Sequence, residues 1–161
     1  KGLRESFFTR VTAHQQFREQ VLAHPSVKSL VDFHSRNKFL VLAYKPDIYR
    51  QLGRVVANAG KGELQTVISE YFALMMLALS RMPSRKKQTN VLMHFQGFFK
   101  KHLTREEKLE LSECIEFYRV GLVPLYAPLT LLKHHLKKHP NEYLEQQSFF
   151  QPYPLELGIQ G

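Results

Sequence analysis

The stretch Tyr71–Leu79, which reads YFALMMLAL, is the longest apolar run of the chain and decides its fold class. It is too short to cross a bilayer, because a membrane-spanning helix needs about 20 apolar residues. Its apolar spacing continues on both sides over about residues 63–82, without the alternation that marks a half-buried strand. We therefore expect a buried helix, and its apolar character on all sides predicts a central position.

Helical spacing extends over nearly the whole chain, and no alternating strand pattern is present. Prolines, glycines and capping residues divide it into further helices of about residues 3–22, 26–44, 46–59, 84–102, 104–123 and 125–139. The remainder, about 141–161, is rich in aromatic residues and proline, and we expect an extended tail that wraps the core. The prediction is an all-α, single-domain bundle of six or seven helices over residues 1–161, joined by short loops.

The composition limits the kinds of partner and compartment. The chain has 161 residues with 23 Lys and Arg against 14 Asp and Glu, a formal net charge of +9. Such an excess favours a partner that carries phosphates over a membrane surface. The single cysteine, Cys114, cannot form an internal disulfide or a zinc site by itself. We expect a cytoplasmic protein without membrane association, and its oligomeric state is left open.

Residues 71–105 contain no Asp or Glu at all. Surfaces usually mix both signs, so a one-signed field of this length indicates capture of a polyanion, with nucleic acid the expected partner. The cations of this stretch are Arg81, Arg85, Lys86, Lys87, Lys100, Lys101 and Arg105.

The fifth expected helix separates these charges from its apolar residues. At about 100° per residue, Val91, Leu92, Phe95, Phe98 and Phe99 share one side. We call the opposite side the basic face; it consists of Lys86, Asn90, His94, Gly97, Lys100 and Lys101, with Lys87 at its edge. Gly97 has two interpretations. A missing side chain lets a phosphate or ribose approach the backbone, or it lets another helix come close.

The second expected helix carries polar residues where apolar ones belong. Val27, Leu30, Val31 and Val41 define its buried arc, yet His34 and Asn37 fall inside that arc and Lys38 at its border. Buried polar groups must be hydrogen-bonded, so this cluster either forms an internal network or opens to a cleft, which Arg54 could join. Elsewhere, the spacing of His135 and His139 suits a metal, but no third ligand is evident. We predict no metal and no cofactor.

Several ordered motifs resemble those of the YbgA-like family, a helical domain of unknown function. They are FHSRNKFLVLAY at 33–44 with Leu52-Gly53-Arg54 downstream, TNVLMHFQGFFKK at 89–101, YRVGLVPLYAPLTLLKHH at 118–135, Tyr143-Leu144 and Pro152-Tyr153-Pro154. The resemblance covers most of the chain. It departs at the end, where the family's expected arginine-asparagine pair is absent and Leu157 leads into Gly158-Ile159-Gln160-Gly161.

The resemblance implies an accessory role. Family members occur alone or fused behind a cysteine-bearing domain that desulfurises thiolated uracil or uridine, and the helical part is expected to engage RNA there. The catalytic cysteines belong to that other domain, so this domain alone is not expected to be an enzyme. By position, the family-like polar residues are His34, Arg36, Lys38, Arg54, Asn90, His94, Lys100, Lys101 and Arg119.

The sequence therefore predicts a domain that binds nucleic acid, with structured RNA such as tRNA favoured over DNA. The expected nucleic-acid-binding residues are Arg36, Lys38, Arg54, Arg81, Arg85, Lys86, Lys87, Asn90, His94, Lys100 and Lys101, and the polar-cleft candidates are His34, Asn37 and Arg119. Two alternatives remain. One is an enzyme of unknown reaction whose cleft lies around His34, Asn37, Lys38 and Arg54, and the other is a module that docks on an acidic protein.

Overall fold

The computed structural model describes residues 2–159, and the side chains of residues 2–157. The described residues form helices joined by loops and contain no strand, so the all-α prediction is confirmed. They divide into two compact units, one made of residues 2–83 and 147–159 and the other of residues 84–146. The prediction of a single domain over 1–161 stays a prediction, and its residues 1, 160 and 161 lie outside the described ones.

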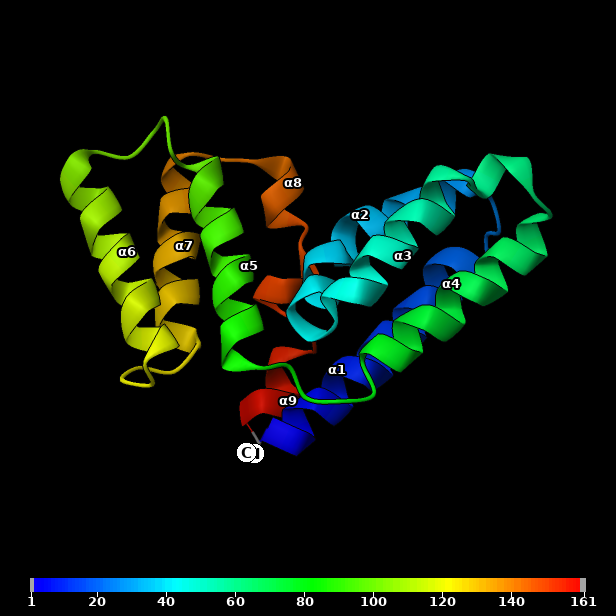
Figure 1. The fold of residues 1–161 in the computed structure, drawn as a ribbon, viewed down its shortest axis with the longest axis horizontal. Coiled ribbons are helices and arrows are strands. Elements are labelled where there is room, and N and C mark those ends of the chain that lie inside the picture. Colours follow the sequence, from blue (N-terminus) through cyan, green and yellow to red (C-terminus); the bar gives the residue numbers. More distant parts are fainter. Residues whose placement is uncertain (1, 160–161) are drawn as a thin grey trace. The chain divides into compact units, whose positions relative to one another are not determined.

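The first unit contains the helices labelled α1 to α4 and α9 in Figure 1. Helix α1 ends in a π-helical turn, η1, and short 3₁₀ turns, η2 and η3, follow α3 and precede α9. Their bounds are α1 Gly2–Phe17, η1 Arg18–Leu22, α2 Val27–Tyr44, α3 Pro46–Ala57, η2 Ala59–Lys61, α4 Leu64–Ala78, η3 Ser148–Phe150 and α9 Leu155–Ile159.

Local sequence explains where these helices begin. Ser26 caps α2 in a reciprocal box, because its hydroxyl accepts from the Ser29 N–H while the Ser29 hydroxyl accepts from the Ser26 N–H. Pro46 is the first residue of α3, where its fixed φ suits the first turn. Proline has no N–H, but no hydrogen bond is lost, because an N–H at this position has no partner within the helix. Both starts agree with the sequence prediction to within one residue.

The central helix of the first unit is α2, not α4. Residues 39–44 of α2 are buried one after another, whereas Leu77 in the apolar run of α4 is 61% exposed. Helix α4 packs on α1, α2 and α3 through one side only, which holds Ile68, Tyr71 and Met75. The expectation that α4 is central is therefore wrong. Apolar composition did not distinguish a helix enclosed by its neighbours from one that lies at the edge.

The arc assigned to α2 also needs correction. Val27 and Val31 are 39% and 36% exposed, and Phe33 is buried in their place. Phe33 belongs to an aromatic cluster in which its ring meets Phe17 edge-on at 5.1 Å. The Phe17 ring in turn stacks on Tyr71 at 6.0 Å between centroids. The large aromatic rings of this cluster, rather than the valines, determine which side of α2 faces inward.

Part of the C-terminal segment completes the first unit. The Gln147 amide donates to the Ser35 carbonyl at 2.7 Å, and the Ser148 hydroxyl donates to Asn37 Oδ1 at 2.7 Å. Phe149 and Phe150 are buried. These contacts fasten residues 147–150 to α2. The segment is not extended throughout, because it contains two short helices, α8 Glu142–Glu145 and α9.

The second unit is a bundle of three long helices, α5 Arg85–Phe98, α6 Arg105–Arg119 and α7 Tyr126–Lys138, followed by α8 Glu142–Glu145. Each long helix packs on the other two, and Figure 1 shows them side by side. Ser84 caps α5 by accepting from the Lys87 N–H. Thr104 and Glu107 form a reciprocal capping box at the start of α6.

Candidate functional site

The basic face of α5 is exposed over its whole length. Val91, Leu92 and Phe95 are buried, while Lys86, Asn90, His94, Gly97, Lys100 and Lys101 are exposed and Lys87 is half-buried. Helix α5 has 14 residues and ends at Phe98, not at about residue 102 as expected, so Lys100 and Lys101 lie in the turn that follows the helix. Within α5 the helical wheel divides the residues as expected, except that Phe98 is 38% exposed.

The glutamates of α6 do not neutralise three lysines of the basic face, Lys86, Lys100 and Lys101. Within residues 2–157, Lys86, Lys100 and Lys101 make no ion pair and no side-chain hydrogen bond. Glu107 instead lies 4.0 Å from Lys138 on α7, and Glu116 pairs with Arg119 on its own helix. The three lysines are therefore available to an external anion.

Gly97 lies in open space on this face. A Cβ atom built at Gly97 would meet no other heavy atom within 4 Å. Close approach of a second helix therefore does not explain the glycine within the described part of the chain. A helical glycine costs up to about 1 kcal/mol relative to alanine. The other interpretation, in which the bare backbone admits a phosphate or ribose, stays a prediction.

Arg85 has a structural role. Its guanidinium donates to the Tyr118 carbonyl at 2.8 Å and lies 5.0 Å from the centroid of the Tyr118 ring. The Tyr118 hydroxyl returns to α5 by donating to Gln88 Oε1. Gly121, which follows α6 with φ of +88°, brings its backbone beside the same guanidinium. These contacts join the start of α5 to the end of α6, and contact of Arg85 with phosphate stays a prediction.

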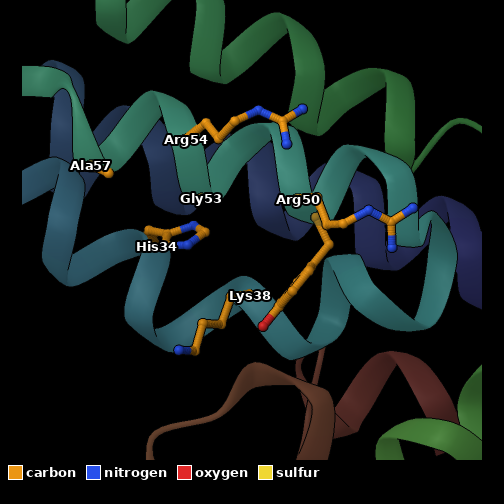
Figure 2. A pocket seen from close by; sticks show the side chains of 7 residues that line it. His34, Lys38, Arg50, Gly53, Arg54 and Ala57 are labelled. Carbon is orange, nitrogen blue, oxygen red and sulfur yellow. The ribbon is translucent and has the colours of Figure 1, made fainter.

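A second candidate site is a hollow in the first unit, of about 420 Å³, between α2 and α3 (Figure 2). Its lining consists of His34 and Lys38 from α2, and Tyr49, Arg50, Gly53, Arg54 and Ala57 from α3. It contains no carboxylate. The structure thus brings His34, Lys38 and Arg54 together, as the cleft hypothesis predicts, and adds a second arginine and an aromatic ring.

His34 is held in one orientation by a buried tyrosine. Its Nδ1 lies 2.9 Å from the hydroxyl of Tyr71, which is fully buried. Burial first, and then the positive charge of Lys38, lower the pKa of His34 from 6.5 to about 4. The imidazole is therefore neutral at physiological pH and is not one of the cations of the hollow.

Three other predicted residues lie outside the hollow. Asn37 is buried, donates to the Phe33 carbonyl at 2.8 Å and accepts from Ser148, so it belongs to an internal network. Arg36 donates to Gln20 Oε1 at 2.5 Å, which ties α2 to η1. Arg119 pairs with Glu116 in the second unit. Arg81, by contrast, is exposed just after α4, with no partner among the described residues.

Sequence reasoning missed Tyr49, Arg50, Gly53, Ala57 and Tyr71. Gly53 and Ala57 stand four residues apart on α3, a spacing that places two small residues on one helical side. That signal was present in the sequence. The contact between Tyr71 and His34 joins residues 37 positions apart, and no local pattern reports it.

The histidines of α7 show no metal geometry. His135 is buried with its Nδ1 3.9 Å from Glu107, whereas the His139 ring stacks on His102 at 5.2 Å. No group of three metal-ligating side chains occurs in the part of the chain that the structure describes. Over the same residues, none of the helices has the length and apolarity that crossing a membrane requires.

These features define an all-α protein with a lysine-rich helix surface in one unit and an arginine-lined hollow in the other. The chain belongs to the family described as "Protein of unknown function (DUF1722)", whose model matches residues 38–154. It is also 35% identical, over 132 residues, to "Uncharacterized protein YbgA" of Escherichia coli (strain K12), an alignment that covers 81% of this chain and 78% of that protein. The resemblance to the YbgA-like family is confirmed. No solved structure matches.

Proposed function

We propose that this protein binds structured RNA, with tRNA the expected form, through the basic face of α5. The observation that carries the proposal is the set of exposed lysines, Lys86, Lys100 and Lys101, that no carboxylate of the described chain neutralises. Uncompensated cations attract phosphates and release the counterions of the nucleic acid. Contacts of this kind recognise the shape of a folded RNA rather than its sequence.

Asn90 and Gly97 give the face a second property. The Asn90 amide can both donate and accept hydrogen bonds, so it suits ribose hydroxyls as well as phosphates. Gly97 leaves backbone uncovered between Asn90 and Lys100. Together they allow an RNA strand to lie closer to the helix than long side chains alone would permit.

A more specific version of the proposal is that this protein has an accessory function. The family resemblance implies that members occur alone or fused behind a domain that desulfurises thiolated uracil or uridine. A helical domain that holds tRNA would present the substrate to such a partner or fused domain. This chain itself would then contribute binding and no catalytic group.

The first test reverses two charges of the face. The double variant Lys100→Glu/Lys101→Glu is expected to weaken tRNA binding at least tenfold, about 1.4 kcal/mol, because two attractive interactions become repulsive. The log–log dependence of affinity on salt should flatten by about 0.7–0.9 for each phosphate that the variant no longer neutralises. Fluorescence anisotropy with labelled tRNA over a salt series measures both quantities.

The matched control is Lys45→Glu/Lys61→Glu, which makes the same change in net charge outside α5. Lys45 is exposed at the N-cap of α3, where a carboxylate is well placed, and Lys61 is exposed in η2. We expect this control to bind tRNA nearly as the unchanged protein does. Equal loss in both double variants would show that only total charge matters. A stable protein complex that survives nuclease treatment would favour docking on an acidic partner instead.

The second test uses Gly97. Gly97→Ala is expected to raise the free energy of unfolding by up to about 1 kcal/mol because the new methyl group meets no neighbour. The same change should weaken tRNA binding, since it covers the bare backbone. Gly60→Ala in η2, outside the hollow, is the matched control, because its Cβ is equally unobstructed. Stabilisation of both variants with unchanged tRNA affinity would remove Gly97 from the interface.

A further inference from the structure

Neither close packing nor backbone conformation explains the glycine of α3 that lines the hollow between α2 and α3. Gly53 lies in the interior of α3, where glycine costs about 1 kcal/mol relative to alanine. A Cβ atom at this position would meet nothing within 4 Å, so close packing does not require the glycine. The φ angle of Gly53 is not in the left-handed region, so the backbone conformation does not require a glycine either. An unfilled space above a costly glycine indicates a ligand.

His34 offers a fixed hydrogen-bond donor to that ligand. Burial raises the pKa of Tyr71 far above its usual range, so the phenol keeps its proton. Within the described chain, the acceptor for that buried O–H is His34 Nδ1. The proton of the neutral imidazole therefore sits on Nε2. Figure 2 shows the His34 ring extending from α2 toward α3, across the hollow.

Cations border the same space. Arg50 is paired with Asp47 at 2.5 Å, whereas the exposed Arg54 guanidinium has no partner among residues 2–157. Lys38 stands one turn after His34 on α2. A guanidinium presents a planar fork of donors that fits two oxygens of a phosphate. With no carboxylate in the lining, the hollow favours an anionic group.

The remaining lining is apolar. Gly53, Ala57 and the ring of Tyr49 supply it, and a flat ring of a ligand can lie on such a wall. The volume of about 420 Å³ falls within the range of about 300–1,000 Å³ that is usual for small-molecule sites. One site thus combines a surface for a planar ring with cations for a charged group.

We propose that the hollow binds a single nucleotide, its phosphate held by Arg54 and its base placed on the wall formed by Gly53, Ala57 and Tyr49, while Lys38 adds positive charge on the α2 side of the hollow. The His34 Nε2–H donates to an acceptor of the base or sugar. The nucleotide is either a free nucleoside monophosphate or an unpaired nucleotide of an RNA strand. The hollow belongs to the first unit and the basic face to the second, so this inference does not rest on RNA binding by α5.

Calorimetry with the full chain tests the proposal. The probes are the four nucleoside 5′-monophosphates, uridine, inorganic phosphate and an unstructured tetranucleotide. At least one nucleoside monophosphate, or the tetranucleotide, is expected to bind at least tenfold more tightly than uridine or phosphate. Tighter binding of the tetranucleotide identifies RNA as the source of the nucleotide, and tighter binding of a monophosphate identifies a free nucleotide.

Two variants then locate the site. Gly53→Leu fills the hollow, and Arg54→Ala removes the unpaired guanidinium from an exposed position; each should reduce binding of the preferred probe at least tenfold. Arg18→Ala is the matched control, because Arg18 is an exposed arginine of the same unit outside the hollow. Lys100→Glu/Lys101→Glu should leave this binding unchanged, which separates it from the function proposed for α5.

Three results would overturn the proposal. They are no binding of any nucleotide probe to the unchanged protein, binding of inorganic phosphate as tight as that of the nucleotides, and unchanged binding in Arg54→Ala. Circular dichroism shows whether Gly53→Leu is folded. If it is not, Arg54→Ala still decides the outcome, since the Arg54 side chain makes no hydrogen bond or ion pair within the described chain on which the fold could depend.

Discussion

Replacing Phe17 by alanine is expected to lower the free energy of unfolding by about 3–5 kcal/mol, as for other fully buried aromatic residues. Phe17 is 0% exposed, and its ring meets Phe33, Tyr71 and Phe72 with centroid distances of 5.1, 6.0 and 5.1 Å. Removing the ring leaves a cavity that these neighbours, which come from two other helices, can fill only in part. Urea denaturation followed by circular dichroism measures the change.

Phe7→Ala is the matched control for this prediction. Phe7 lies on the same helix, α1, but is 52% exposed. The same loss of atoms there should change the free energy of unfolding by no more than about 0.5 kcal/mol. If Phe17→Ala were equally mild, the aromatic cluster would not be the centre of the first unit. Since Tyr71 is part of this cluster and positions His34, Phe17→Ala should also weaken binding at the hollow.

His34 is expected to make the protein less stable in acid. The pKa of His34 is about 4 in the folded protein, whereas a histidine of an unfolded chain titrates near 6.5. Above pH 6.5 the ring is neutral in both states and contributes no difference. Between pH 6.5 and 4 the unfolded state binds the proton first, so the free energy of unfolding falls as pH is lowered. One pKa unit corresponds to about 1.4 kcal/mol, so the full effect is roughly 3 kcal/mol.

The measurement compares pH profiles of stability for the unchanged protein and His34→Asn. Asparagine does not titrate, yet its side-chain oxygen can still accept from the Tyr71 hydroxyl. The difference between the two profiles should grow below pH 6.5 and level off near pH 4, which separates His34 from the carboxylates that also titrate there. His24→Asn, at an exposed position, is the control and should follow the unchanged protein. Parallel profiles for His34→Asn and the unchanged protein would contradict the buried, neutral histidine.

Local chemistry was enough to predict the helices. The capping box of Thr104 and Glu107, the proline at position 46 and the buried side of α5 were all readable from residues close together in the sequence. Each depends on a backbone turn or on the period of one helix, so no knowledge of the rest of the fold is needed.

The predictions that were wrong or incomplete concern contacts between residues that are distant in the sequence. The order of burial in the first unit was misjudged, because the position of α4 at the edge follows from how other helices cover α2. The assignment of Asn37 to a network required Ser148, which lies 111 positions away. Three of the seven lining residues, His34, Lys38 and Arg54, were predicted because they are unusual for their positions. The spacing of Gly53 and Ala57 is also visible in the sequence, but that they line a hollow depends on their neighbours in space.

The first unit is interrupted in the sequence by the second, since Ser84–Gln146 separates Pro83 from the Gln147 that returns to α2. During synthesis on the ribosome, all residues of the second unit emerge before the last ones of the first. A premature stop ahead of Gln147 would therefore leave the sequence of α5 to α8 complete. The first unit, although synthesised earlier, would lack Phe149 and Phe150, which are buried in its interior.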